Sequence, residues 1–278
     1  MSIPIFKAYH NIFFNEEECI KYLLENNVLY NIERCEQCNS ITTRKEKFYV
    51  CSNQQCRKTV SVFTRSFFSN KNISCCDILL IAYYWIANAK YSTISSITGH
   101  SSATIVKYIN IFWNLVVNTL IDNNLIIGGK NKIVEIDESK FKKNENWWCV
   151  GGVERTAKWK CFFEIVEERN KETLKQIIKQ HVHQESIIHT DKWKAYSCVE
   201  ELGFRHRVVN HSRNRIERGT GVYTNHIEGL WHGVKLNISS RNRNKNIVKN
   251  YLLDFAWRRK HKNNLWLAFL KALESCKQ

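Results

Sequence analysis

The sequence predicts an α/β protein in which a mixed five-stranded sheet follows a small metal-binding segment and a group of helices. Three observations indicate this fold class. Two cysteine pairs lie close together near the N-terminus, apolar residues recur with helical spacing in the next segment, and strand-like and helix-like segments alternate from residue 131 onward. We therefore divide the chain into an N-terminal region (1–70), a helical segment (71–128) and a C-terminal domain (129–278).

Length and charge limit the class of protein. The 278 residues include 42 Lys and Arg against 26 Asp and Glu, which gives a formal net charge of +16. Such a balance favours nucleic acid as a partner, although a generally basic composition is an alternative. No apolar run approaches the ~18 residues of a membrane span, and the N-terminus lacks the pattern of a signal peptide. We expect an intracellular protein without a membrane partner, whose 11 cysteines suit metal binding better than disulfides.

Four cysteines have the spacing of a zinc ribbon. Cys35 and Cys38 form a C-x2-C pair, Cys51 and Cys56 form a looser C-x4-C pair, and the strand-like stretch 44–50 lies between them. Four thiolates can bind one tetrahedral Zn²⁺, and this closed shell makes the ion structural. The alternative is four unrelated thiols. We interpret the other seven cysteines as packing residues: Cys19, Cys75, Cys76, Cys149, Cys161, Cys198 and Cys276.

The next segment has the outline of a helix-turn-helix. One helix covers residues 79–86 and a short second helix begins at Ile94. Ser101 or Ser102 can cap a third helix from Ala103 to Asn118, which could lie in a DNA groove. A three-helix packing module without DNA contact gives the same pattern.

The C-terminal domain shows three strands followed by alternating helices and strands. The strands are expected at 132–139, 147–155, 159–168, 186–191 and 206–210, and the helices at 170–182, 192–202 and 223–235. The order β-β-β-α-β-α-β-α is the ribonuclease-H-like order, so we predict a ribonuclease-H-like domain with a mixed five-stranded sheet.

Three acidic residues fall on elements that can meet at one edge of such a sheet. Asp137 lies on the first strand, Asp191 ends the fourth strand, and Glu228 lies on the last helix. Three neighbouring carboxylates repel one another, and divalent cations remove that cost. Mg²⁺, or Mn²⁺, prefers carboxylate oxygens, and two ions ~3.5–4 Å apart can activate a hydroxyl and stabilise the leaving oxygen of a phosphodiester. The sequence therefore predicts a two-ion site.

Each of these acidic residues also has an ordinary structural interpretation. Asp137 could be a polar residue at a strand end, with Glu135 or Glu138 as the relevant acid. Asp191 could cap the following helix. Glu228 could be a surface residue paired with Lys235 or another neighbour.

Several short stretches, taken in order, resemble the Merlin-type DDE transposases and their bacterial insertion-sequence relatives. They are VEIDESKF, GGVER, HTDKWKAY, VNHS, TNHIEGLW with Lys235, and YLLDFAWRRK. Each stretch alone is a weak signal, but their order and the 36 residues between Asp191 and Glu228 are specific. The resemblance covers most of the chain.

The resemblance implies a DNA transposase in which Asp137, Asp191 and Glu228 bind the metal ions and Lys235 contacts DNA phosphate. Asn225 matches a position that some relatives use in the third role, but an anionic ligand such as Glu228 suits Mg²⁺ better than a neutral amide. The implied reaction is cleavage at the terminal repeats and transfer of the 3′-hydroxyl into target DNA, by at least a homodimer. It would take place in a nucleus or a bacterial nucleoid. A domesticated, catalytically silent DNA-binding protein and a structure-specific nuclease are alternative functions of the same fold.

Other residues could assist this site. Trp231 could stack on a displaced base or belong to the core. Four histidines could take part, although a structural role is the commoner one: His189, His211, His226 and His232. Six basic residues could bind phosphate or simply cover a solvated helix face: Arg241, Arg243, Lys245, Arg258, Arg259 and Lys260.

Overall fold

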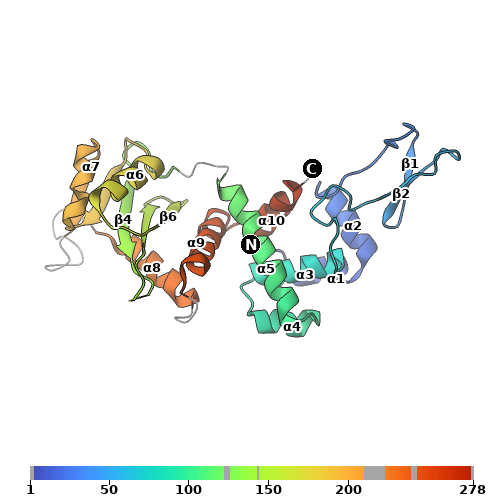
Figure 1. Cartoon of the computed structure of the whole chain (residues 1–278), viewed down its shortest axis with the longest axis horizontal. Coiled ribbons are helices and arrows are strands. Elements are labelled where there is room, and N and C mark those ends of the chain that lie inside the picture. Colours follow the sequence, from blue (N-terminus) through green and yellow to red (C-terminus); the bar gives the residue numbers. More distant parts are fainter. Residues whose placement is uncertain (1–2, 122–125, 143, 210–222, 239–242, 277–278) are drawn as a thin grey trace. The chain divides into compact units, whose positions relative to one another are not determined.

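The computed structural model describes residues 3–121, 126–142, 144–209, 223–238 and 243–276 (Figure 1). The chain forms two compact units, and each is described by itself. Unit 1 comprises Met1–Val116 and His261–Gln278, and unit 2 comprises Val117–Lys260. Within the described residues, no helix combines the length and apolarity that a membrane crossing requires.

Unit 1 is mainly helical. Its helices are α1 (Phe6–Phe14), α2 (Glu16–Glu25), α3 (Cys75–Ile86), α4 (Tyr91–Thr98), most of α5 (Ser102–Ile121) and α10 (Leu265–Glu274). Helices α3, α4 and α5 lie where the helical spacing of apolar residues predicts helices. The Ser101 hydroxyl accepts the N–H of Thr104 at 3.2 Å and so caps α5, while Gly99 ends α4 in the left-handed region with φ of 72°.

Two features of unit 1 differ from the sequence analysis. Helices α1 and α2 were not predicted; the side chain of Asn15 accepts the N–H groups of Glu17 and Glu18 and thereby starts α2. The sequence analysis assigns residues 261–278 to the C-terminal domain, whereas Phe269 of α10 is fully buried against Trp85 of α3 and Phe112 of α5.

The cysteine-rich part of unit 1 is a three-stranded antiparallel sheet made of β1 (Thr42–Lys45), β2 (Phe48–Cys51) and β3 (Thr59–Ser61). The stretch 44–50 is therefore not one strand but a hairpin, in which Lys45 pairs with Phe48. Glu46 makes the turn with a φ of 49°. Sequence did not reveal this turn because Glu-Lys lacks the Asn or Gly that usually marks such a two-residue loop.

Unit 2 contains the mixed five-stranded sheet that the sequence predicts. Its elements are β4 (Ile133–Ser139), β5 (Trp148–Glu154), β6 (Cys161–Val166), α6 (Lys171–His181), β7 (Ile187–Asp191), a 3₁₀ turn (Lys194–Ser197), α7 (Cys198–Glu201), β8 (Arg205–Val209), α8 (Asn225–Asn237) and α9 (Lys245–Lys260). The strand order is β6-β5-β4-β7-β8, with β4 antiparallel to β5 and parallel to β7.

The two faces of this sheet differ in chemistry, because successive side chains of a strand point to opposite faces. Val134, Ile136 and Ile188 belong to the apolar core that α6 and α7 complete. Glu135 and Asp137 lie on the other face, which α8 covers. Figure 1 shows α6 and α7 on one side of β4 and α8 on the other. The acidic face of β4 is thus the face that meets the helix carrying Glu228.

A glycine on β5 allows α8 to approach this acidic face. Gly151 pairs with Asp137 across the β4–β5 ladder. A Cβ at Gly151 would lie 2.7 Å from the Cη2 and Cζ2 atoms of the Trp231 ring, which is closer than carbon atoms can pack. The missing side chain therefore makes room for the Trp231 indole next to Asp137.

We expect Gly151→Ala to destabilise unit 2 by about 1–3 kcal/mol, since overpacking displaces either Trp231 or the strand. The matched control is Gly229→Ala, a helical glycine whose added Cβ would meet no atom within 4 Å. That change should stabilise α8 by about 0.5–1 kcal/mol. Denaturant unfolding of both variants checks the pair, and equal stability of the two would contradict the packing described here.

Candidate functional site

Two aspartates meet at the carboxyl ends of neighbouring parallel strands. Glu135 of β4 pairs with His189 of β7. Continuing this register by two residues sets Asp137 beside Asp191, with both side chains on the face that α8 covers. Both residues are partly exposed, so solvent and ligands can reach them.

Helix α8 brings the third carboxylate to the same end of the sheet. Trp231 donates its indole N–H to Asp137 Oδ2 at 3.1 Å, which fixes the middle of α8 over the end of β4. Glu228 lies one turn earlier on α8, is exposed, and accepts a hydrogen bond from the Thr224 hydroxyl at 3.2 Å. Strand β4, strand β7 and helix α8 therefore each supply one acid to this region.

The negative charges around Asp137 affect its pKa. Burial, together with repulsion from Glu138, Asp191 and Glu228, raises the pKa of Asp137 to about 7, while the backbone N–H of Glu138 acts to lower it. The N–H of Glu138 and the Trp231 indole are neutral donors, so they do not cancel this charge. A bound cation would do so, and the donor set of three carboxylates is the one that Mg²⁺ prefers.

The three acids are not among the closely spaced groups of possible metal ligands. Within the described part of the chain, the two groups whose possible ligand atoms all lie within 4.8 Å of one another are both made of cysteines. The three carboxylates are therefore more widely spread.

The two acidic neighbours of Asp137 have partners of their own. Glu138 points to the opposite face, where it accepts hydrogen bonds from Arg169 at 2.9 Å and from the Tyr196 hydroxyl at 2.6 Å. Glu135 shares the face of Asp137 but is fully buried. Neither competitor is thus a good candidate for an exposed cation site.

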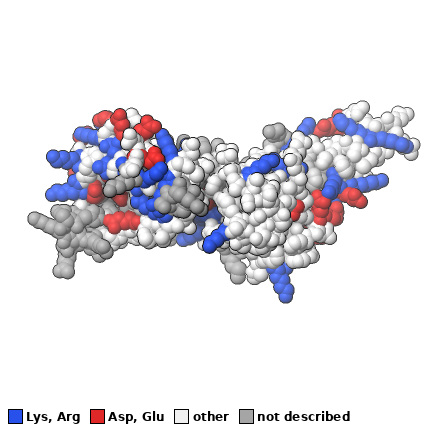
Figure 2. Space-filling model, turned by 60° about the horizontal axis from the view of Figure 1, so that its bottom comes forward, with Lys and Arg blue, Asp and Glu red and all other residues white. Residues whose placement is uncertain are grey.

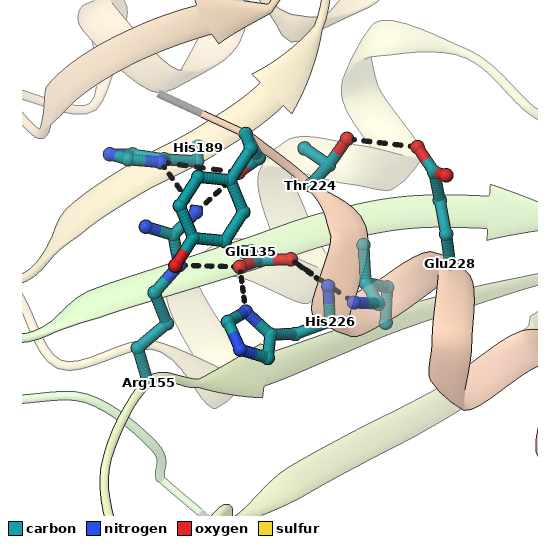
Figure 3. A network of polar contacts seen from close by, with 8 residues as sticks. Glu135, Arg155, His189, Thr224, His226 and Glu228 are labelled. Atoms are coloured by element: carbon teal, nitrogen blue, oxygen red, sulfur yellow. Dashed lines mark hydrogen bonds and ion pairs between the residues drawn. The ribbon is translucent and has the colours of Figure 1, made fainter. Parts of the chain in front are cut away.

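The Glu135 carboxylate holds the N-terminus of α8, as Figure 3 shows. One of its oxygens accepts the backbone N–H groups of His226 at 2.9 Å and Ile227 at 3.1 Å. The other accepts the His226 ring N–H at 2.7 Å and a hydrogen bond from the Arg155 guanidinium. A carboxylate at this position also interacts favourably with the helix dipole. Glu135 therefore fixes α8, and with it Glu228, relative to β4.

Arg155 extends this network to the chain that leads into α8. Its guanidinium donates to the Tyr223 carbonyl, lies 3.6 Å from the centre of the Tyr223 ring, and donates to His189 Nδ1 at 3.3 Å. Burial, and then the Arg155 charge, lower the pKa of His189 to about 4. His189 is therefore neutral at physiological pH and accepts from Arg155. Glu135 lies in the stretch VEIDES and Arg155 in the stretch GGVER. The sequence analysis did not predict that these two residues pair.

Asp191 is not the N-cap of the following turn. Its Oδ1 accepts the N–H of Trp193 at 3.0 Å, two residues on, and Trp193 itself is the residue that precedes the 3₁₀ turn. This contact is a local Asx-type turn. It uses one lone pair of the carboxylate, so the remaining ones can still bind a cation.

The other predicted site residues lie as follows. The Lys235 ammonium is 5.5 Å from the Phe141 ring centre; burial, and then the Arg243 charge, lower its pKa, while the negative charge of Asp137 acts to raise it. Asn225 is the exposed first residue of α8. Trp231 is 5% exposed and belongs to the core, which leaves little of it for base stacking. His232 is exposed, and His211 lies outside the described residues.

Most of the basic residues expected to bind phosphate have partners within the protein. Arg258 pairs with Asp254 at 2.8 Å, Lys245 pairs with Glu167 at 2.7 Å, and Arg259 donates to the Trp159 carbonyl at 3.0 Å. Arg243 donates to the last carbonyl groups of α8. Lys260 is exposed, and Arg241 lies outside the described residues. A sequence pattern of charges could not separate these structural roles from DNA contacts.

The four cysteines of the expected zinc ribbon come together in unit 1. The Sγ atoms of Cys35 and Cys56 are 3.7 Å apart, those of Cys38 and Cys51 are 3.4 Å apart, and all four lie within 4.8 Å of one another. A tetrahedral ion with Zn–S bonds of about 2.3 Å separates its sulfurs by about 3.8 Å. This group could hold one zinc ion. Asn53 accommodates the longer C-x4-C spacing, because its carbonyl accepts the N–H of Cys56 at 3.1 Å.

Comparisons with known proteins point in one direction. The sequence model of the ISXO2-like transposase domain matches residues 122–260, which is half of the chain. An "Uncharacterized transposase-like protein" from Haemophilus influenzae is 29% identical over 102 residues, covering 36% of this chain and 81% of that protein.

A cryoEM structure of the simian T-cell lymphotropic virus intasome in complex with PP2A regulatory subunit B56 gamma is similar over 62% of this chain. The match covers 66% of that chain, just under two thirds of its length, with a TM-score of 0.31 and 14% identity. A similarity of this size does not establish a common fold.

We expect Glu135→Gln to loosen the start of α8, because a neutral amide leaves Arg155 without its charge partner and weakens the cap on two backbone N–H groups. Breaking such a buried pair costs about 3–5 kcal/mol. Hydrogen exchange of a peptide covering residues 223–231 should become faster.

The control is Glu154→Gln, since Glu154 is also buried but accepts from Gly128 and Thr156, away from α8. Its exchange over 223–231 should match the wild type. Unchanged exchange in Glu135→Gln would show that this carboxylate does not hold the helix.

Proposed function

The chain belongs to the ISXO2-like transposase domain family, and we propose from this premise that it is a DNA transposase. It would cleave DNA at the transposon ends and transfer the freed 3′-hydroxyl into target DNA. Unit 2 would be the catalytic unit, with a ribonuclease-H-like fold and a relation to Merlin-type elements within the wider group.

The observation that supports this reaction is the meeting of three acids from three elements. Asp137, Asp191 and Glu228 come from β4, β7 and α8, and the charges of the other two act on Asp137. Divalent cations, when bound there, would supply the Lewis-acid stabilisation that phosphodiester cleavage needs. The residues themselves would bind and space the cations, while Trp231 orients the Asp137 carboxylate.

Lys235 would attract a DNA phosphate toward the acids. It lies on α8 seven residues after Glu228, which is two turns and the same helix face. Arg243 donates to the Lys235 carbonyl at 2.9 Å and so keeps the end of α8 in place. The Lys235 ammonium would offset the repulsion between the acids and the phosphate. This contact would contribute to affinity rather than to sequence choice.

Unit 1 would recognise the transposon ends. The exposed side of α5 carries Val106, Lys107, Asn110 and Asn114, and α5 contains no acidic residue. Asn side chains can read adenine, and Lys can bind phosphate. The four-cysteine group would hold a structural zinc ion. Since a transposase must join two ends, the active form would be at least a homodimer.

The charge distribution is compatible with DNA binding. Figure 2 shows Lys and Arg side chains on unit 2, drawn on the left, with Asp and Glu side chains between them. The chain that carries the three acids has a formal net charge of +16. Electrostatic attraction of this kind makes affinity for DNA strongly dependent on salt.

The proposal is tested with the purified chain, Mg²⁺, and linear DNA that contains the reading frame with its genomic flanks. We expect cleavage at the terminal repeats and a loss of more than ~100-fold in Asp191→Asn and Glu228→Gln, since even outer partners of metal ligands contribute ~10–100-fold. Asn at position 191 can still accept the Trp193 N–H, so the turn should persist. Glu172→Gln, an exposed change on α6, is the matched control and should cleave as the wild type does.

The outcomes separate the alternatives. Undiminished cleavage by Asp191→Asn would reject the catalytic assignment. Cleavage that ignores the terminal repeats would indicate a structure-specific nuclease, and DNA binding without any cleavage would indicate a catalytically silent binding protein. A loss in Asn225→Ala equal to that in Glu228→Gln would assign a role to the amide as well.

A further inference from the structure

Three cysteines that do not belong to the ribbon lie together in the core of unit 1. The Sγ atoms of Cys19, Cys75 and Cys76 all lie within 4.8 Å of one another. The three residues are 0%, 3% and 7% exposed. The sequence analysis interpreted them as packing residues because 55 residues separate Cys19 from the adjacent pair. The fold brings them into the same arrangement of close sulfurs that the ribbon cysteines have.

Two of the three cysteines lie at the N-terminal end of a helix. Ser74 caps α3 by accepting the N–H of Asp77 at 3.0 Å, so Cys75 and Cys76 are the first two residues of the helix. Free N–H groups and the helix dipole stabilise negative charge at that position. Cys19 reaches the same point from α2, whose residues contact α3.

A cavity reaches the cluster at Cys75. It has a volume of about 300 Å³, and Cys75, Glu16, Lys47 and Lys71 contribute to its lining. Glu16 and Lys47 form an ion pair of 2.6 Å at this cavity. A cation bound by the three sulfurs could complete its shell with a water molecule or the Glu16 carboxylate from this side.

We propose that Cys19, Cys75 and Cys76 form a second metal site, which binds one thiophilic d¹⁰ cation through three thiolates. Soft sulfur ligands select Zn²⁺ or Cu⁺ over Mg²⁺ or Ca²⁺. Zn²⁺ would take a fourth ligand from the cavity, whereas Cu⁺ is satisfied by three thiolates. Because α2 and α3 each provide ligands, the ion would tie α2 to the start of the helical segment. This site is independent of the proposed transposase reaction.

The experiment counts metal ions on the full reduced chain. After equilibration with Zn²⁺ and removal of excess, elemental analysis should give two zinc ions per chain for the wild type. Cys76→Ala and Cys19→Ser should each give one. The double variant Cys38→Ala with Cys51→Ala, which removes the ribbon site, should also give one. Cys198→Ala, a buried cysteine of unit 2, is the matched control and should keep two.

X-ray absorption of the ribbon double variant should then report three sulfur ligands around the remaining zinc. A parallel arm supplies Cu⁺ under argon: displacement of one zinc by one copper in the wild type, but not in Cys76→Ala, would identify Cu⁺ as the preferred ion. Circular dichroism of each variant confirms that the helices persist.

One zinc ion per chain in the wild type, together with no uptake of Cu⁺, would overturn the proposal. So would two ions in both the wild type and Cys76→Ala. A mass 2 Da below the reduced value, with Cys19 linked to Cys75 or Cys76 under reducing conditions, would replace the metal site with a disulfide.

Discussion

The buried carboxylate of Glu135 is the interaction on which the geometry of the acidic face depends. It sits at the N-terminus of α8 and receives two backbone N–H groups, the His226 ring and the Arg155 guanidinium. A buried charge is tolerated only where such partners satisfy it. The position of α8 over β4 is therefore not adjustable without leaving this charge unpaired. Because Glu228 lies one turn into α8, its backbone position is fixed as well.

The same strand carries a structural acid, Glu135, and an acid that is partly exposed, Asp137. Glu135 and Asp137 are two residues apart on one face, yet the first is neutralised inside the protein and the second faces the open end of the sheet. Asp137 receives neutral donors and the repulsion of its acidic neighbours, so its charge is left for a ligand from outside. A strongly basic chain thus contains a small acidic region, where under the proposed function cations and a DNA phosphate would meet. Gly151 contributes to this geometry, because its lack of a side chain makes room for Trp231 beside the Asp137 carboxylate.

Much of unit 2 could be predicted from sequence, for reasons that are local. Strict alternation around Asp137 indicated a strand with one polar face, and the apolar stretch before Asp191 indicated a buried strand. What could not be predicted depends on contacts between distant segments. The pairing of Glu135 with Arg155 follows from the β4–β5 register, and the meeting of Cys19 with Cys75 follows from helix packing. Neither leaves a periodic signal in the sequence. The turn at Glu46 was hidden for a different reason, since its residues are not turn formers.

The claim that the three acids bind cations together is tested most directly by locating Mn²⁺ in crystals of the protein through its anomalous scattering. The account predicts anomalous density between Asp137 and Asp191, with Glu228 contributing an oxygen within coordination distance of about 2.0–2.3 Å from a bound ion. Density bound only by acids elsewhere on the surface, or an ion at the two aspartates with Glu228 turned away to solvent, would contradict it.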